Sequence, residues 1–98
     1  MVIKKEWIVF KDADSAMESE VYGRGGADKL FLQAIGTFTE LIIEIQGKLH
    51  EDTDFVGGVS ISGRDIQEVD LTPYKYFKIN IKAFTGTNVT IYARTTAQ

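Results

Sequence analysis

The sequence predicts an all-β protein, an antiparallel β-sandwich of jelly-roll-like form with about eight short strands. Three observations predict this class. Apolar and polar residues alternate with a period of two in several segments, which is typical of strands with one buried face. Glycine-rich breaks separate these segments, and they supply residues suited to turns. The 98 residues give room for a single domain, residues 1–98, with one modest core.

The alternation is clearest in residues 77–83, where every odd position is apolar and every even position is polar. Residues 89–94 repeat the pattern, and residues 41–45 repeat it less regularly because Ile42 falls on the polar side. We expect the apolar positions of these three strands to form the core: Leu41, Ile43, Ile45, Phe77, Ile79, Ile81, Val89 and Ile91. Further predicted strands are Val2–Phe10, Leu30–Ile35, Val56–Ile61, Ile66–Leu71 and, more weakly, Glu20–Tyr22.

The last two strands are predicted to form a hairpin around the loop Thr85-Gly86-Thr87. In that register Lys78 lies opposite Arg94, and two like charges in that position are mildly destabilising. The two cations therefore need acidic neighbours, and Glu40 and Glu44 on another strand are the natural candidates. Those neighbours could belong to the same subunit or to the next one.

Composition and charge exclude several classes of protein. A hydrophobic fraction of 44% with 26% charged residues predicts a folded chain. The net charge of −3 argues against a nucleic-acid surface, which would carry clustered excess lysine and arginine. No apolar run approaches the ~18 residues of a membrane span, and Lys4, Lys5 and Glu6 interrupt any signal peptide. We therefore expect folding in the cytoplasm, with no membrane partner.

Catalytic and metal-binding patterns are weak. The chain has no cysteine and one histidine, His50, in a polar loop where a solvated side chain is expected. Asp12 and Asp14, like Asp52 and Asp54, have the spacing that begins a calcium loop, but neither pair continues as one. The prediction is a protein that is not an enzyme, with no catalytic residues, no metal and no cofactor.

Four aromatic residues allow a second interpretation. Trp7, Tyr74, Tyr76 and Tyr92 could form a sugar-stacking platform, since flat rings beside hydrogen-bonding groups suit carbohydrate binding. The other interpretation is that Trp7 and Tyr76 lie in the core or at its edge. On that interpretation Tyr92 is expected to be the most exposed of the four, because its neighbours Ile91 and Ala93 face inward.

The second half of the chain resembles small virion proteins of tailed bacteriophages and prophages. The likeness consists of a strand that ends in glycine, a short strand that ends in Asp-Leu, a strand with a Tyr-x-Tyr start, and a closing Gly-x-x-Val-Thr-hydrophobic-Tyr strand. The segments that carry it are residues 41–47, 66–71, 74–81 and 86–94. Many of those relatives have an aromatic residue, often tryptophan, in the loop where this chain has Phe55. The resemblance implies a β-sandwich that assembles into a virion as a head decoration, head-fibre or tail component, often as a homo-oligomer.

We therefore expect a non-enzymatic structural or assembly module of a phage-like virion, made in the bacterial cytoplasm. The alternative is a carbohydrate-binding β-sandwich module, which could serve in receptor binding. We further expect a homo-oligomer whose interface uses the polar face of the final hairpin or the sheet edge beside it. The candidate interface residues are Glu40, Glu44, Lys78, Lys82, Tyr92 and Arg94. Alternatively, the acidic and basic stripes lie on neighbouring strands and neutralise each other within the monomer.

Overall fold

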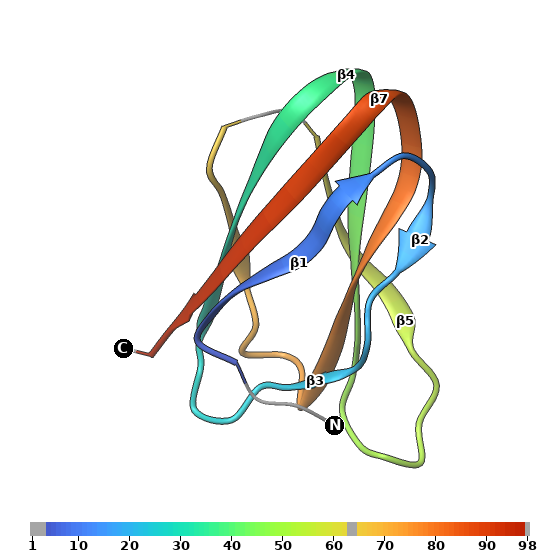
Figure 1. The fold of residues 1–98 in the computed structure, drawn as a ribbon. Helices are drawn as coiled ribbons and strands as arrows, with labels where there is room; N and C mark the ends of the chain where they lie inside the picture. Colours follow the sequence, from blue (N-terminus) through green and yellow to red (C-terminus); the bar gives the residue numbers. More distant parts are fainter. Residues whose placement is uncertain (1–3, 63–64, 98) are drawn as a thin grey trace.

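The computed structural model describes residues 4–62 and 65–97, and Figure 1 shows two long strands that run through the whole molecule. All secondary structure in the described residues is β-strand. The strands are β1 (Glu6–Ala13), β2 (Met17–Glu18), β3 (Tyr22–Gly23), β4 (Lys29–Lys48), β5 (Val56–Ser62), β6 (Gln67–Asp70) and β7 (Tyr76–Thr96).

The strands β4 and β7 pair with each other along their full length and form the centre of one antiparallel, seven-stranded sheet. Along the outer edge of β7, β1 pairs with the C-terminal part, while β2 and β3 pair with the N-terminal part. Along the outer edge of β4, β6 pairs with the N-terminal part and β5 with the C-terminal part. The short strands that pair with β7 therefore precede β4 in the chain, and those that pair with β4 lie between β4 and β7.

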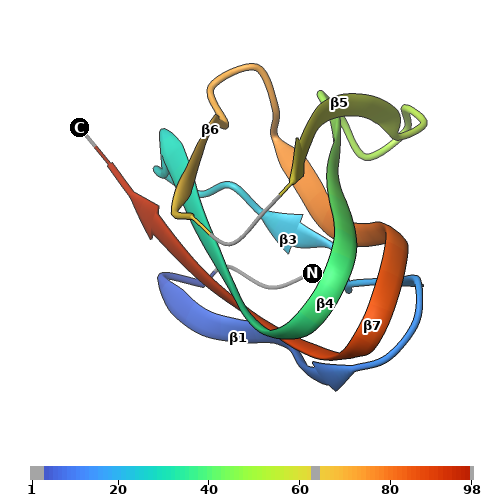
Figure 2. The same ribbon diagram turned by 90° about the horizontal axis from the view of Figure 1, so that it is seen from above.

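The sheet bends across the middle of both long strands and encloses the core. Figure 2 shows β4 and β7 curling together around the interior. We call β1, residues 88–96, residues 29–37 and β6 the β1/β6 half of the sheet. The β5 half consists of β2, β3, residues 76–86, residues 38–48 and β5. Among the described residues no pairing joins the outer edges, so the sheet is not closed.

Two glycines allow the long strands to approach closely at this bend. A β-carbon on Gly36 would lie 2.3 Å from the carbonyl oxygen of Asn88, and one on Gly86 would lie 2.4 Å from the Cα atom of Phe38. The register of the β4–β7 ladder shifts at the same place, between Thr37 and Phe38. Glycine is therefore required on both strands, because any side chain would push the two backbones apart.

The core lies between the two halves of the bent sheet. All eight residues that the alternation assigned to the core are buried, so that prediction is confirmed. The interior also contains residues from the strands whose patterns were less regular. Those additions include Phe10, Tyr22, Leu30, Leu32, Ala34, Val69 and Leu71.

The all-β, antiparallel part of the predicted fold class is confirmed, whereas the predicted final hairpin is wrong. The chain from Tyr76 to Thr96 is one strand, and both of its parts pair with β4 rather than with each other. The predicted strands 30–35 and 41–45 likewise belong to the single strand β4. The reason is that Gly36 and Gly86 serve close backbone contact instead of chain reversal. The predicted first strand is β1, and the part of that prediction before Lys4 lies outside the described residues.

Candidate functional site: the outer face of the β1/β6 half

The outer face of the β1/β6 half is organised in rows of neighbouring residues across the strands. In one row, Arg94 of β7 lies between Glu6 of β1 and Phe31 of β4. In the next row, Tyr92 lies between Ile8 and Gln33. Because side chains alternate between the two faces of a strand, these residues point away from the core, whereas Ile91 and Ala93 are buried within it.

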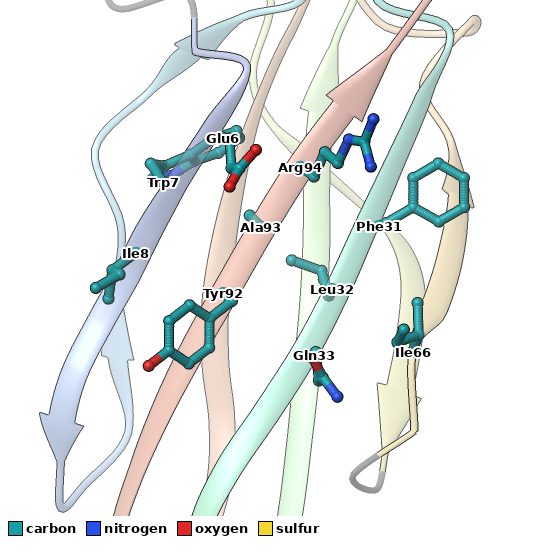
Figure 3. A pocket seen from close by; sticks show the side chains of 10 residues that line it. All are labelled: Glu6, Trp7, Ile8, Phe31, Leu32, Gln33, Ile66, Tyr92, Ala93 and Arg94. Carbon is teal, nitrogen blue, oxygen red and sulfur yellow. The ribbon is translucent and has the colours of Figure 1, made fainter.

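Large apolar side chains gather on this face. Four of the seven exposed large hydrophobic residues in the described chain lie here: Ile8 (48% exposed), Ile35 (54%), Ile66 (65%) and Tyr92 (42%). The half-buried Phe31 lies among them, and we call these five residues the apolar patch. Figure 3 shows Ile8 and Tyr92 on one side and Phe31 and Ile66 on the other. An open depression of about 680 Å³ lies here, lined by the ten residues labelled in Figure 3.

Charged residues flank the patch at both ends. Glu6 and Arg94 lie at one end, next to Phe31. Lys11 and Asp12 lie at the other end, where the backbone N–H of Asp12 donates to the hydroxyl of Thr90 over 3.1 Å. In the part of the chain that the structure describes, none of these four residues forms an ion pair within 4.0 Å. The patch therefore has charged groups of both signs at each end.

At one corner of this face, a basic and an acidic side chain pair within the chain. Lys29 of β4 donates a hydrogen bond to the carboxylate of Glu68 on β6, the strand that pairs with this part of β4. That hydrogen bond, together with the negative charge of Glu68, raises the pKa of Lys29. The charge of Glu68, which lies opposite Phe31, is therefore matched within the chain.

The outer face of the β5 half differs, because two of its lysines form ion pairs with carboxylates of the same chain. The ammonium group of Lys82 lies 3.1 Å from the Glu44 carboxylate, and that of Lys78 lies 3.0 Å from the Glu18 carboxylate. Gln46 also donates to Glu44 over 2.8 Å. The hydrogen bond from Lys82, with a smaller contribution from Gln46, lowers the pKa of Glu44.

The six candidate interface residues are thus divided between two faces. Four lie on the β5 half, where Glu40 accepts a hydrogen bond from the Thr85 hydroxyl over 3.3 Å. Tyr92 and Arg94 lie on the β1/β6 half. The neutralising arrangement considered from the sequence is present for Glu44 and Lys82, which are neighbours within one chain.

The four aromatic residues considered for glycan binding do not share one platform. The Trp7 ring packs at 5.1 Å on the ring of Tyr22, a core residue whose pKa is raised by burial. Tyr76 is buried, and its hydroxyl lies 3.4 Å from the Glu51 carboxylate. Tyr74 and Tyr76 line a second depression, at the β3 end of the molecule, whereas Tyr92 faces the first.

The potential metal ligands of the described residues do not come together in one group. No group of three or more histidine, aspartate or glutamate side chains is placed to hold a metal ion in that part of the chain. His50 lies in an exposed loop, where its Nδ1 atom is 3.6 Å from the Asp52 carboxylate. Among residues 4–62 and 65–97 there is also no helix long and apolar enough to cross a membrane.

The fold and the exposed sheet face define an all-β protein with a bent antiparallel sheet. No protein-family model matches the chain, and no curated protein matches it. Among solved structures, the chain is similar to the crystal structure of the SPBc2 prophage-derived protein YomS, with a TM-score of 0.74 over 97% of each chain. The two sequences are 17% identical, so the likeness shows a shared fold.

The alternation pattern of the sequence did not identify Phe31, Ile35 and Ile66 as surface residues. A signal was present in residues 30–35, where apolar residues occupy both faces of the strand instead of alternating. A strand with two apolar faces has either a second buried side or an exposed patch. The structure shows that only the face with Leu30, Leu32 and Ala34 is covered.

Proposed function

We propose that this protein is a non-catalytic assembly module of a phage-like particle, in the role of a head decoration, head-fibre or tail component. The observation that carries the proposal is the apolar patch on the outer face of the β1/β6 half. Exposed apolar side chains scattered singly are common on protein surfaces, whereas several of them gathered on one face often mark an interaction site. The proposed location is the virion, after synthesis in a bacterial cytoplasm.

Two further observations support this role. The fold is shared with a prophage-derived protein, which agrees with the resemblance of residues 41–94 to phage virion proteins. The sheet itself suits assembly, because an outer face supported by a packed core can be covered without changing the fold. We also propose that the bent sheet is a β-sandwich of jelly-roll-like form.

The test is to look for the chain in purified particles. Phage-like particles from the bacterium that carries the gene are separated on a density gradient and probed with an antibody to the chain. The proposal predicts that the chain migrates with the particles in a fixed ratio to the major head or tail proteins. Recovery of the chain only in the soluble fraction, with particles otherwise complete, would contradict it.

A further inference from the structure

We propose that the apolar patch binds a second copy of the same chain, face to face. The two copies are related by a two-fold axis that lies in the plane of the interface, runs perpendicular to the strands and passes over Tyr92. This inference rests on the proposed function and deepens it by naming the partner of the same surface.

The charges make the patch complementary to itself. Glu6 and Arg94 flank one end, Lys11 and Asp12 flank the other, and all four lack an ion-pair partner in the described chain. A partner of one charge sign would leave half of these groups unmatched. A copy rotated by the two-fold axis brings each end over the opposite end, so Glu6 meets Lys11 of the second copy. Arg94 then lies within reach of Asp12 of the second copy.

The same rotation matches the apolar residues. Tyr92 lies on the axis and meets Tyr92 of the second copy, while Ile8 meets its own equivalent. Phe31 belongs to the row of Arg94, and Ile35 pairs with Thr90 in the row at the other end. The rotation therefore sets Phe31 against Ile35 of the second copy. This is an isologous contact, in which one surface recognises itself.

A rotation about an axis parallel to the strands is less favourable. If that axis ran between β7 and β4, the row of Glu6, Arg94, Phe31 and Glu68 would lie over its own reversed copy. Glu6 would then face Glu68 of the second copy, whose carboxylate is already paired with Lys29, so Glu6 would meet no basic partner. The perpendicular axis is the arrangement that matches unlike charges and apolar groups together.

The size of the patch sets the expected affinity. Four strands about 4.8 Å apart and three rows of outward residues give a projected area on the order of 400 Å² per copy. Interfaces of this size lie at the weak end of specific association, below roughly 1,200 Å² in total. The dimer is therefore expected to dissociate in dilute solution and to form at high local concentration, as on a particle surface.

The experiment uses charge reversal in two separate chains. Glu6→Lys and Lys11→Glu are made singly, and sedimentation equilibrium is measured from about 10 to 500 µM at low salt. The wild-type mass is expected to rise toward that of two copies. Each single variant should weaken association roughly tenfold or more, because like charges then face each other in both halves of the dimer.

Mixing the two variants separates contacts between chains from effects within one chain. In an equal mixture, position 6 of the Glu6→Lys chain faces position 11 of the Lys11→Glu chain. Unlike charges then meet in both halves of the mixed dimer, so association should return to the wild-type level. Positions 6 and 11 are about 13 Å apart along one strand, so pairing within a chain cannot explain the recovery. Leu49→Ser, which alters an exposed apolar residue in a distant loop, is the matched control and should associate like wild type.

Three results would overturn the proposal. The first is a wild-type chain that stays monomeric at the highest concentration, and the second is a mixture that fails to recover. The third is equal weakening by Leu49→Ser. A chain that is monomeric in solution but present in purified particles would contradict the self-association alone and leave the proposed function standing.

Discussion

The ring of Tyr74 lies directly over the backbone of Gly47, where a β-carbon would come within 2.3 Å of the ring's Cδ1 atom. Gly47 belongs to the inward-facing series of β4, after Ile43 and Ile45. The tyrosine ring therefore fills the place that a side chain at position 47 would otherwise take, and it closes this end of the core.

Substitution Gly47→Ala is expected to displace that ring. Overpacking of this kind costs about 1–3 kcal/mol of unfolding free energy. The control is Gly26→Ala, because a β-carbon there has no atom within 4 Å outside the two neighbouring residues. Urea denaturation of both variants measures the difference. Equal stability of the two variants would show that Tyr74 moves away without cost.

The loss of stability on truncating an isoleucine to alanine is expected to depend on which face of the sheet carries it. Ile79 is fully buried, and Ile79→Ala should lower the free energy of unfolding by about 2–5 kcal/mol. Ile35→Ala removes the same atoms from an exposed position and should cost less than about 1 kcal/mol. Chemical denaturation compares the two, and a similar loss for both would contradict the assigned faces.

The acid side of the stability curve should depend on Glu44. Lys82 holds the pKa of this carboxyl below its ordinary value of 4.5, so the charged form is the one that stabilises the fold. This contribution is present above pH 4.5 and is lost as the pH falls through the lower pKa of the folded state. Glu44→Gln should therefore flatten the decline in melting temperature over that range.

The matched control for Glu44→Gln is Glu40→Gln on the same strand. Glu40 has no basic partner within 4.0 Å in the described part of the chain, and its carboxylate accepts from Thr85 instead. Glu40→Gln should leave the decline in melting temperature at acid pH nearly as in the wild type. Identical curves for both variants would remove the role assigned to Lys82.

Metal removal should not affect folding. The described residues contain no group of three potential metal ligands, so packing and hydrogen bonds are the expected source of stability. Melting temperature is measured with and without EDTA. A decrease of several degrees with chelator, reversed by added calcium, would reveal a metal site.

The sequence predicts those features of the fold that depend on residues close together in the chain. Alternation depends only on neighbouring residues, so it identified Phe77, Ile79, Ile81, Val89 and Ile91 as buried, although Asn80 on the polar side is buried as well. It could not show that both segments form one strand, because the role of Gly86 is set by Phe38, which is distant in the chain. A glycine in a turn and a glycine under a crossing strand look alike in sequence.

The candidate site was predictable only in part, for the same reason. Tyr92 was expected to be the exposed aromatic residue, and the structure confirms this. Its apolar neighbours Ile8, Phe31 and Ile66 come from other parts of the chain, so they become a patch only through sheet pairing. Likewise, the pairing of Lys82 with Glu44 depends on the β4–β7 register, which alternation alone does not determine.

The most direct test of the central claim, that the apolar patch is the assembly surface, is the incorporation of variants into particles. Tagged wild-type chain, Tyr92→Lys and the control Leu49→Lys are produced in the bacterium that carries the gene, and purified phage-like particles are probed for the tag. Circular dichroism first establishes that all three chains fold. The account predicts wild type and Leu49→Lys in the particles and Tyr92→Lys in the soluble fraction. Incorporation of Tyr92→Lys at the wild-type level would contradict it.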